Sequence, residues 1–242
     1  MKTSYIFGFL LLTGFLFYFP IHAQEIQGEV DFLVGIPRGE FKEQLNRAGV
    51  GIGFIGGYRF KKSPFMLGLD FGYLSYGSDK SDVRIFTAPE FPLELVNKYN
   101  FINLDFLIRL IQSNPDALFR PYLDGLFGIN YLSTDTVLRE KGILGSGREL
   151  LQETSFNDTV LNYGVGAGLL IRIYQPPKQE KTLGEIIARG VYLNLTGRYM
   201  FGGEAEYLKK GSIRRENGQV FYDVSKSNTD LFYMKLGIVL NI

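Results

Sequence analysis

Acidic and basic side chains alternate with apolar ones along much of the chain. Asp70, Asp105 and Asp124 each stand between two apolar or small neighbours, and basic residues occupy equivalent positions elsewhere. Successive residues of a β-strand point to opposite faces, so this spacing places the charges on one face and the apolar side chains on the other. The charged face is predicted to carry Asp70, Asp105, Asp124, Arg59, Arg109, Arg120, Arg172, Arg198 and Lys235, together with Glu29 and Asp31.

Charges gathered on an enclosed face must be paired or hydrated, because an unpaired buried ion costs several kcal/mol. We therefore expect these side chains to form a network of ion pairs. Its centre is predicted to hold Asp70, Asp105, Asp124, Arg109 and Arg172. A proton- or ligand-handling site within the same network is a further possibility of this pattern.

Other chemistry is limited by the residue types that the chain lacks. Its one histidine is His22, and it has no cysteine. Acyl transfer requires a base beside the nucleophile, so Ser146, between Gly145 and Gly147, is interpreted as part of a flexible loop. The sequence does not decide whether two carboxylates are paired in the way that glycoside hydrolysis requires. We expect no enzyme, no catalytic residue and no cofactor.

Metal binding also finds little support in the pattern. Histidine and cysteine ligands are missing after residue 22, which leaves only oxygen ligands for a cation such as Ca²⁺. The acids of the predicted loops do not have the spacing of a calcium-binding loop; they are Asp79, Asp82, Asp135 and Asp158. We expect no metal site.

The N-terminus has the pattern of a secretory signal peptide. Lys2 supplies the positive charge, residues 6–19 are apolar, and residues 21–23 (IHA) form a cleavage site. A transmembrane anchor is the alternative, but the apolar run is shorter than the ~20 residues that a helical span needs. The predicted domains are a signal peptide, 1–23, and a β-barrel, 24–242.

Eight strands are predicted after the signal peptide. The last, 229–242, alternates most regularly: Phe232, Met234 and Leu236 share one face, and Tyr233 and Lys235 share the other. The full set of predicted strands is 25–36, 49–60, 65–77, 99–112, 119–132, 160–174, 189–201 and 229–242. Since the last strand reaches the end of the chain, we expect it to pair with the first and to close a barrel.

The alternation alone does not decide which face of the barrel meets water. A soluble lipocalin-like barrel would turn the apolar face inward and bind hydrophobic ligands. The strands are long, glycines alternate with the charges, and aromatic residues gather near strand ends, as in membrane barrels. The predicted fold class is all-β, an eight-stranded antiparallel up-and-down transmembrane β-barrel, since only helices and closed barrels satisfy the backbone in lipid.

Two segments give the chain a family resemblance. Residues 35–41 (GIPRGEF) and 48–53 (AGVGIG), followed by Tyr58, resemble the opening of Bacteroidetes-type "porin family" outer-membrane β-barrel proteins. Residues 235–242 (KLGIVLNI) are similar to the signal that the barrel-assembly machinery reads, with Ile242 in place of the usual aromatic residue. The resemblance implies an eight-stranded barrel like that of outer-membrane protein A, and it does not by itself imply a pore.

The expected role follows from the barrel and from its connections. Connections one, three, five and seven are longer than connections two and four, as in barrels with short periplasmic turns and long extracellular loops. Connection six, 175–188, is also long and breaks this alternation. Apolar and basic residues of the long connections could contact a protein partner or lipopolysaccharide, or the connections could pack together or extend the barrel wall. We expect an outer-membrane barrel with a charge-plugged lumen and a structural or interaction role.

The alternative role is a small passive channel. The chain has 26 basic and 25 acidic residues, and this balance shows no sign of nucleic-acid binding.

Overall fold

The computed structural model describes residues 25–60, 63–83, 93–114, 117–140, 149–175, 190–208, 214–216, 219–221 and 224–241. The predicted signal peptide, 1–23, and Ser146 lie outside these ranges. No helix within the described ranges is long and apolar enough to cross a membrane.

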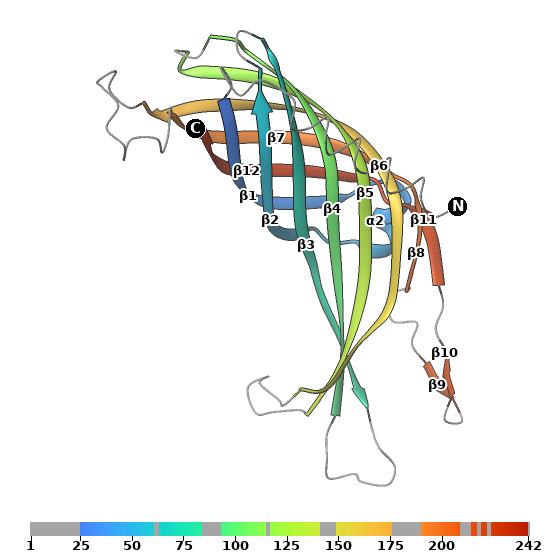
Figure 1. Ribbon diagram of the computed structural model, residues 1–242. Coiled ribbons are helices and arrows are strands. Elements are labelled where there is room, and N and C mark those ends of the chain that lie inside the picture. The colour runs from blue at the N-terminus through green and yellow to red at the C-terminus, as the bar shows by residue number, and fades with distance from the viewer. Residues whose placement is uncertain are drawn as a thin grey trace, which may run out of the picture.

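Eight antiparallel strands close into one barrel (Figure 1). Around the barrel their order is β1-β12-β7-β6-β5-β4-β3-β2, so the predicted pairing of the last strand with the first is confirmed. The barrel strands are β1 (Glu25–Pro37), β2 (Gly49–Arg59), β3 (Phe65–Val83), β4 (Leu93–Ile111), β5 (Phe119–Glu140), β6 (Glu149–Tyr174), β7 (Gly190–Gly202) and β12 (Leu231–Asn241). Neighbours in sequence are neighbours in space, which is the up-and-down arrangement that the sequence predicts.

The apolar rows face outward and the polar rows face inward. In β12, Met234, Leu236 and Ile238 are exposed, whereas Tyr233 and Lys235 between them are buried. The other strands repeat this pattern, and the predicted assignment of the two faces is confirmed. A lipocalin-like barrel with an apolar interior is therefore wrong, because the side chains that would line its cavity point away from the lumen.

Four strands continue past the rim of the barrel. Figure 1 shows β3, β4, β5 and β6 running on as a twisted sheet beyond the other strands. Pairing between β4 and β5 reaches Leu93 and Glu140, far outside the predicted bounds of both strands. The predicted strand bounds were therefore wrong for residues 78–83, 93–98, 133–140 and 149–159, and the alternative that the long connections extend the barrel wall is confirmed for these residues. Backbone hydrogen bonds between these strands continue beyond the residues in which apolar and polar side chains alternate, and the bounds were predicted from that alternation.

The connections differ at the two ends of the barrel. At the short-turn end, β2 joins β3 through residues 60–64 and β4 joins β5 through residues 112–118. At the opposite end, which we call the long-connection end, β1 joins β2 through the helix α2 (Gly39–Leu45). The connection from β7 to β12 there holds two hairpins, made by β8 (Glu204–Leu208) with β11 (Val224–Asn228) and by β9 (Arg214–Glu216) with β10 (Gln219–Phe221).

Helix α2, which the sequence did not predict, covers the long-connection end. Phe41 and Leu45 lie one turn apart on the same helix face and pack against the barrel's apolar cluster. The Phe41 ring meets Tyr76 edge-on at 6.2 Å, and Tyr76 meets Phe101 at 6.5 Å. The helix ends where Asn46 adopts a left-handed conformation (φ 32°). A seven-residue helix is too short for apolar periodicity to reveal.

Inward glycines give the polar side chains the room that they occupy. A Cβ atom at Gly237 would collide with a carboxylate oxygen of Asp31 and with the carbonyl oxygen of Val30. A Cβ atom at Gly28, on the outward face of β1, would meet no other atom within 4 Å. Both glycines lie within the paired part of β1 and β12, but only Gly237 is closely packed by its neighbours.

The substitution Gly237→Ala is expected to destabilise the folded barrel by ~1–3 kcal/mol, because the new methyl group overpacks the lumen. Urea unfolding of the protein refolded in detergent micelles measures the change. Gly28→Ala is the matched control and should have little effect. Equal stability of the two variants would show that the lumen is not tightly packed at this position.

Candidate functional site

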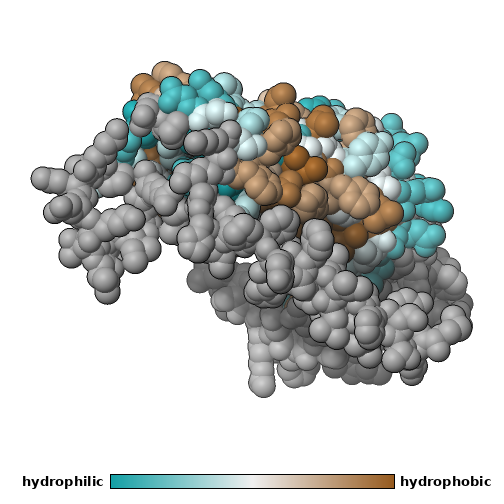
Figure 2. Space-filling view, turned by 45° about the horizontal axis from the view of Figure 1, so that its top comes forward, coloured by the Kyte–Doolittle hydropathy of each residue, from teal (hydrophilic) through white to brown (hydrophobic). Residues whose placement is uncertain are grey.

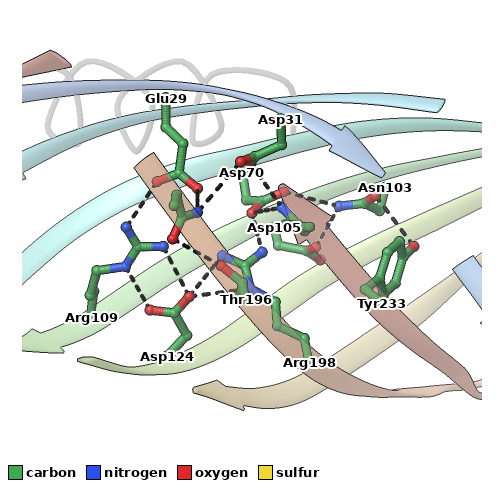
Figure 3. A network of polar contacts seen from close by, with 12 residues as sticks. Glu29, Asp31, Asp70, Asn103, Asp105, Arg109, Asp124, Thr196, Arg198 and Tyr233 are labelled. Carbon is green, nitrogen blue, oxygen red and sulfur yellow. Dashed lines mark hydrogen bonds and ion pairs between the residues drawn. The ribbon is translucent and has the colours of Figure 1, made fainter. Parts of the chain in front are cut away.

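A network of polar side chains fills the middle of the barrel (Figure 3). We define this central network as Glu29, Asp31, Asp70, Asn103, Asp105, Arg109, Asp124, Asn194, Thr196, Arg198, Tyr233 and Lys235. All of these side chains are buried, and they come from six of the eight strands. They meet because each belongs to the inward row of its strand, where the alternating sequence places it.

Arg198 connects opposite walls of the barrel. Its guanidinium donates to Asp124 on β5 at 2.7 Å and forms a second ion pair with Asp70 on β3. Four steps around the barrel separate β7, which carries Arg198, from β3, so this pair crosses the lumen. Side chains of an eight-stranded barrel can fill its interior, and Arg198 does so here.

Arg109 makes the second cross-lumen connection. Its Nε and Nη2 donate to the two oxygens of Asp124 at 2.8 and 3.1 Å, the bidentate geometry that favours arginine. Its Nη1 donates to Glu29 on β1 at 2.9 Å. The guanidinium carbon also lies 3.9 Å from the centre of the Tyr122 ring, within the range of a cation–π contact.

Lys235 and two asparagines complete the pairing. Lys235 Nζ donates to Asp70 at 2.7 Å and lies 3.8 Å from Asp31. Asn194 donates to Glu29 at 2.5 Å and to Asp31 at 3.4 Å, and Asn103 donates to Asp105 at 2.8 Å. The amide groups thus give these carboxylates hydrogen bonds that the three cations do not supply.

The structure separates the predicted charged residues into two groups. The first group shares ion pairs and consists of Glu29, Asp31, Asp70, Asp124, Arg109, Arg198 and Lys235, and Asp105 joins it through Asn103. The other three predicted residues, Arg59, Arg120 and Arg172, lie near the short-turn ends of β2, β5 and β6. The prediction that Arg172 lies at the centre is therefore wrong, because only two residues follow it in β6.

Several neutral members of the network were missed as site residues. Asn103, Asn194, Thr196 and Tyr233 lie in the same inward rows as the charges, and that position was the available signal. Which of these side chains contact one another depends on the stagger between strands. The alternation within a single strand gives no information about that stagger. Tyr122 also belongs here, since its hydroxyl bonds to Thr196 and donates to Asn194 at 2.6 Å.

Apolar side chains close the network at both ends. Toward the long-connection end lie Phe41, Tyr76, Phe101, Leu132, Val160, Met200 and Leu231, members of one buried cluster. Toward the short-turn end lies a second cluster, made of Ile111, Tyr122, Leu170, Tyr192 and Val239. Among the residues that the structure describes, no group of three or more histidine, cysteine, aspartate or glutamate side chains could hold a metal ion.

Comparisons with known proteins show that the fold of the chain is similar to that of solved β-barrels. No protein-family model matches the chain, and the search of curated proteins gives no match. The chain is similar to neisserial surface protein A, with 13% identity, a TM-score of 0.44, and 90% of this chain and 96% of that chain covered.

Two further solved structures give the same level of similarity. A major outer membrane protein of Thermus thermophilus has 10% identity and a TM-score of 0.49, with 91% and 100% of the two chains covered. The Ail protein of Yersinia pestis has 11% identity and a TM-score of 0.39, with 91% and 99% covered. These scores carry no functional argument, and the barrel is established by its own strand pairing. The resemblance to the Bacteroidetes-type porin family stays a prediction.

Replacing Arg109 by alanine is expected to cost ~3–5 kcal/mol of unfolding free energy, because Glu29 and Asp124 lose a fully buried partner. Urea unfolding in micelles measures the loss. The control is Lys226→Ala, which removes a surface pair with Glu204 and should cost no more than ~1 kcal/mol. If both variants unfold at the same urea concentration, Arg109 does not hold the barrel together.

Proposed function

We propose that the protein is an integral outer-membrane β-barrel whose lumen is plugged by charged side chains. Its role is structural or interactive, through the long-connection end, and it is not enzymatic. The observation that carries the proposal is the absence of charge on the outward rows. In the eight barrel strands, the outward positions between residues 26–36, 50–58, 65–73, 102–110, 119–131, 161–171, 191–201 and 232–240 hold no Asp, Glu, Lys or Arg.

The outer surface supports a lipid environment. Large apolar side chains remain exposed all round the barrel, up to 63% at Leu161, and Figure 2 shows them gathered between hydrophilic groups. A monomer in water rarely exposes so much continuous apolar surface. In a bilayer the same surface is satisfied, and a closed barrel leaves no unpaired strand edge in the lipid.

The height of the apolar surface fits an outer membrane. In β1 it runs from Ile26 to Val34, eight residue steps or about 26 Å along the strand at ~3.3 Å per residue. A strand tilt of roughly 40° reduces this to about 20 Å along the axis, near the ~25 Å band of such barrels. Aromatic side chains mark both borders, with Tyr58 against Phe60 at one and Tyr163 against Phe201 at the other.

The predicted signal peptide supports the outer membrane as the location, with the short-turn end on the periplasmic side. The barrel-assembly machinery would then insert the chain, reading residues 235–242. Lipopolysaccharide and outer-membrane lipid would surround the wall. No nucleic-acid contact is proposed.

The plugged lumen argues against the alternative of a passive channel. Arg198 and Arg109 tie opposite walls together, and apolar clusters lie on either side of the central network. Water and ions would have to break these pairs to pass. The surface that remains for function is the long-connection end, where the β8–β11 hairpin and the extended strands β3–β6 offer a face to a protein partner.

Heat modifiability on a gel is the expected sign of the proposed barrel. Protein refolded in detergent should migrate differently before and after boiling, because a closed barrel resists unfolding by detergent alone. A soluble protein with no shift would contradict the membrane location.

Planar-bilayer recording separates a plugged barrel from a channel. We expect no steady conductance above the bilayer baseline for the unmodified protein. Arg198→Ala should raise the frequency of conducting events, since it unties the cross-lumen pair. Steady conductance of the unmodified protein would support the channel instead.

Pull-down from native membranes tests the partner role, and repeated recovery of the barrel alone would contradict it.

A further inference from the structure

The charges inside the barrel are segregated along its axis. The central network contains five carboxylates, Glu29, Asp31, Asp70, Asp105 and Asp124, and three cations, Arg109, Arg198 and Lys235. Among the described residues, the short-turn end holds the opposite excess: three arginines, Arg59, Arg120 and Arg172, with one carboxylate, Glu25, bonded to Arg59 at 3.3 Å. We call these three arginines the arginine cluster.

Two guanidinium groups of the cluster donate hydrogen bonds to the same turn, between β4 and β5. Arg120 Nη2 donates to the carbonyl oxygen of Gln112 at 3.2 Å, and Arg59 Nη2 donates to that of Ser113, the next residue, at 3.3 Å. Because the two carbonyl groups belong to consecutive residues, the two positive charges lie near each other. Arg120 also lies over the Tyr192 ring, 5.5 Å from its centre. Tyr192 is paired in register with Arg172, so Arg172 is the neighbour of Tyr192 on the adjacent strand.

Two of the three arginines, Arg120 and Arg172, lack a counter-ion among the residues that the structure describes. Arg120 is 1% exposed, yet no carboxylate pairs with it and its Nε has no hydrogen-bond acceptor. Arg172 Nη1 is likewise buried without an acceptor, and no carboxylate pairs with Arg172 within the described ranges. Gln27 adds a third buried donor without an acceptor, its Nε2, one inward position along β1 from Glu25.

The excess acids of the central network cannot supply the missing charge. On β4, β5 and β7 the second apolar cluster places Ile111, Tyr122 and Tyr192 between the central residues and the short-turn end. On the far side of this layer, Glu29, Asp70 and Asp124 are already paired with Arg109, Arg198 and Lys235, and Asp105 accepts a hydrogen bond from Asn103. Within the described part of the chain, the arginine cluster therefore faces the short-turn end with more positive than negative charge.

We propose that the arginine cluster binds a phosphate group at the short-turn end of the lumen. Guanidinium forks match the paired oxygens of a phosphate, and several arginines around one oxyanion is a common arrangement for its recognition. An anion also removes the cost of leaving like charges buried together without a partner. Arg172 and Glu25 are only partly buried, which leaves the site open to the solvent at this end.

The phosphate group could belong to free inorganic phosphate or to a phospholipid head group that reaches the rim. Both ligands present phosphate oxygens to the cluster, so they would bind at the same site. A phospholipid head group would therefore compete with inorganic phosphate. Inorganic phosphate is the probe for the first arm of the test, and phosphatidylglycerol is the probe for the second.

Isothermal titration calorimetry of the full barrel in zwitterionic micelles, at constant ionic strength, tests the site. Inorganic phosphate should bind saturably to the unmodified protein. Arg120→Gln and Arg172→Gln should each weaken binding at least tenfold. Arg139→Gln, which removes an arginine paired with Glu94 in the extended part of β5, should leave it unchanged. Arg172 is half-buried, so its variant keeps the test valid if Arg120→Gln fails to fold.

The second arm uses nanodiscs of phosphatidylcholine with and without phosphatidylglycerol. Loss of phosphate binding in the presence of phosphatidylglycerol identifies the head group as the occupant, and unchanged binding identifies free phosphate. The proposal is overturned if phosphate gives no saturable heat in micelles. It is also overturned if the folded Arg172→Gln variant, checked by heat modifiability, binds phosphate as tightly as the unmodified protein.

Discussion

The narrow lumen of an eight-stranded barrel is the constraint on which the structure depends. Every inward side chain faces others across a space of side-chain width, so each inward charge must find a partner there. Arg198 shows the solution, since it reaches from β7 to Asp70 on the opposite wall and also holds Asp124. Inward glycines such as Gly237 provide the room, because any side chain there would occupy the place of Asp31.

This constraint accounts for what the sequence could predict. Alternation in residues such as Leu69, Asp70 and Phe71 determines the face of each side chain, so the two faces and the closure of the barrel were predicted correctly. Alternation says nothing of the stagger between strands. It therefore did not separate Arg109, which reaches Glu29, from Arg172, which stays at the short-turn end. Strand ends were missed in β5 and β6 because backbone pairing there needs no apolar pattern.

The interior changes character along the barrel axis. Helix α2 and aromatic residues close the long-connection end, the central network carries more acids than bases, and arginines gather at the short-turn end. In the proposed function, this arrangement gives a stable barrel wall around an interior filled by paired side chains. The two ends of the barrel differ in structure and chemistry: one carries extended strands and hairpins, and the other carries the arginine cluster. Tight cross-lumen pairing and uncharged outward rows are two results of the same alternation.

Quenching of tryptophan fluorescence by brominated lipid tests the central claim most directly. The chain contains no tryptophan, so a single one reports from one position. In bilayers with brominated acyl chains, the Phe106→Trp variant should be strongly quenched, because Phe106 lies at the middle of the outward row 102–110 of β4. Lys226→Trp, on the exposed face of β11 beyond the barrel, should keep its fluorescence. Equal fluorescence of the two variants, or quenching at position 226 alone, would contradict a barrel whose apolar rows face lipid.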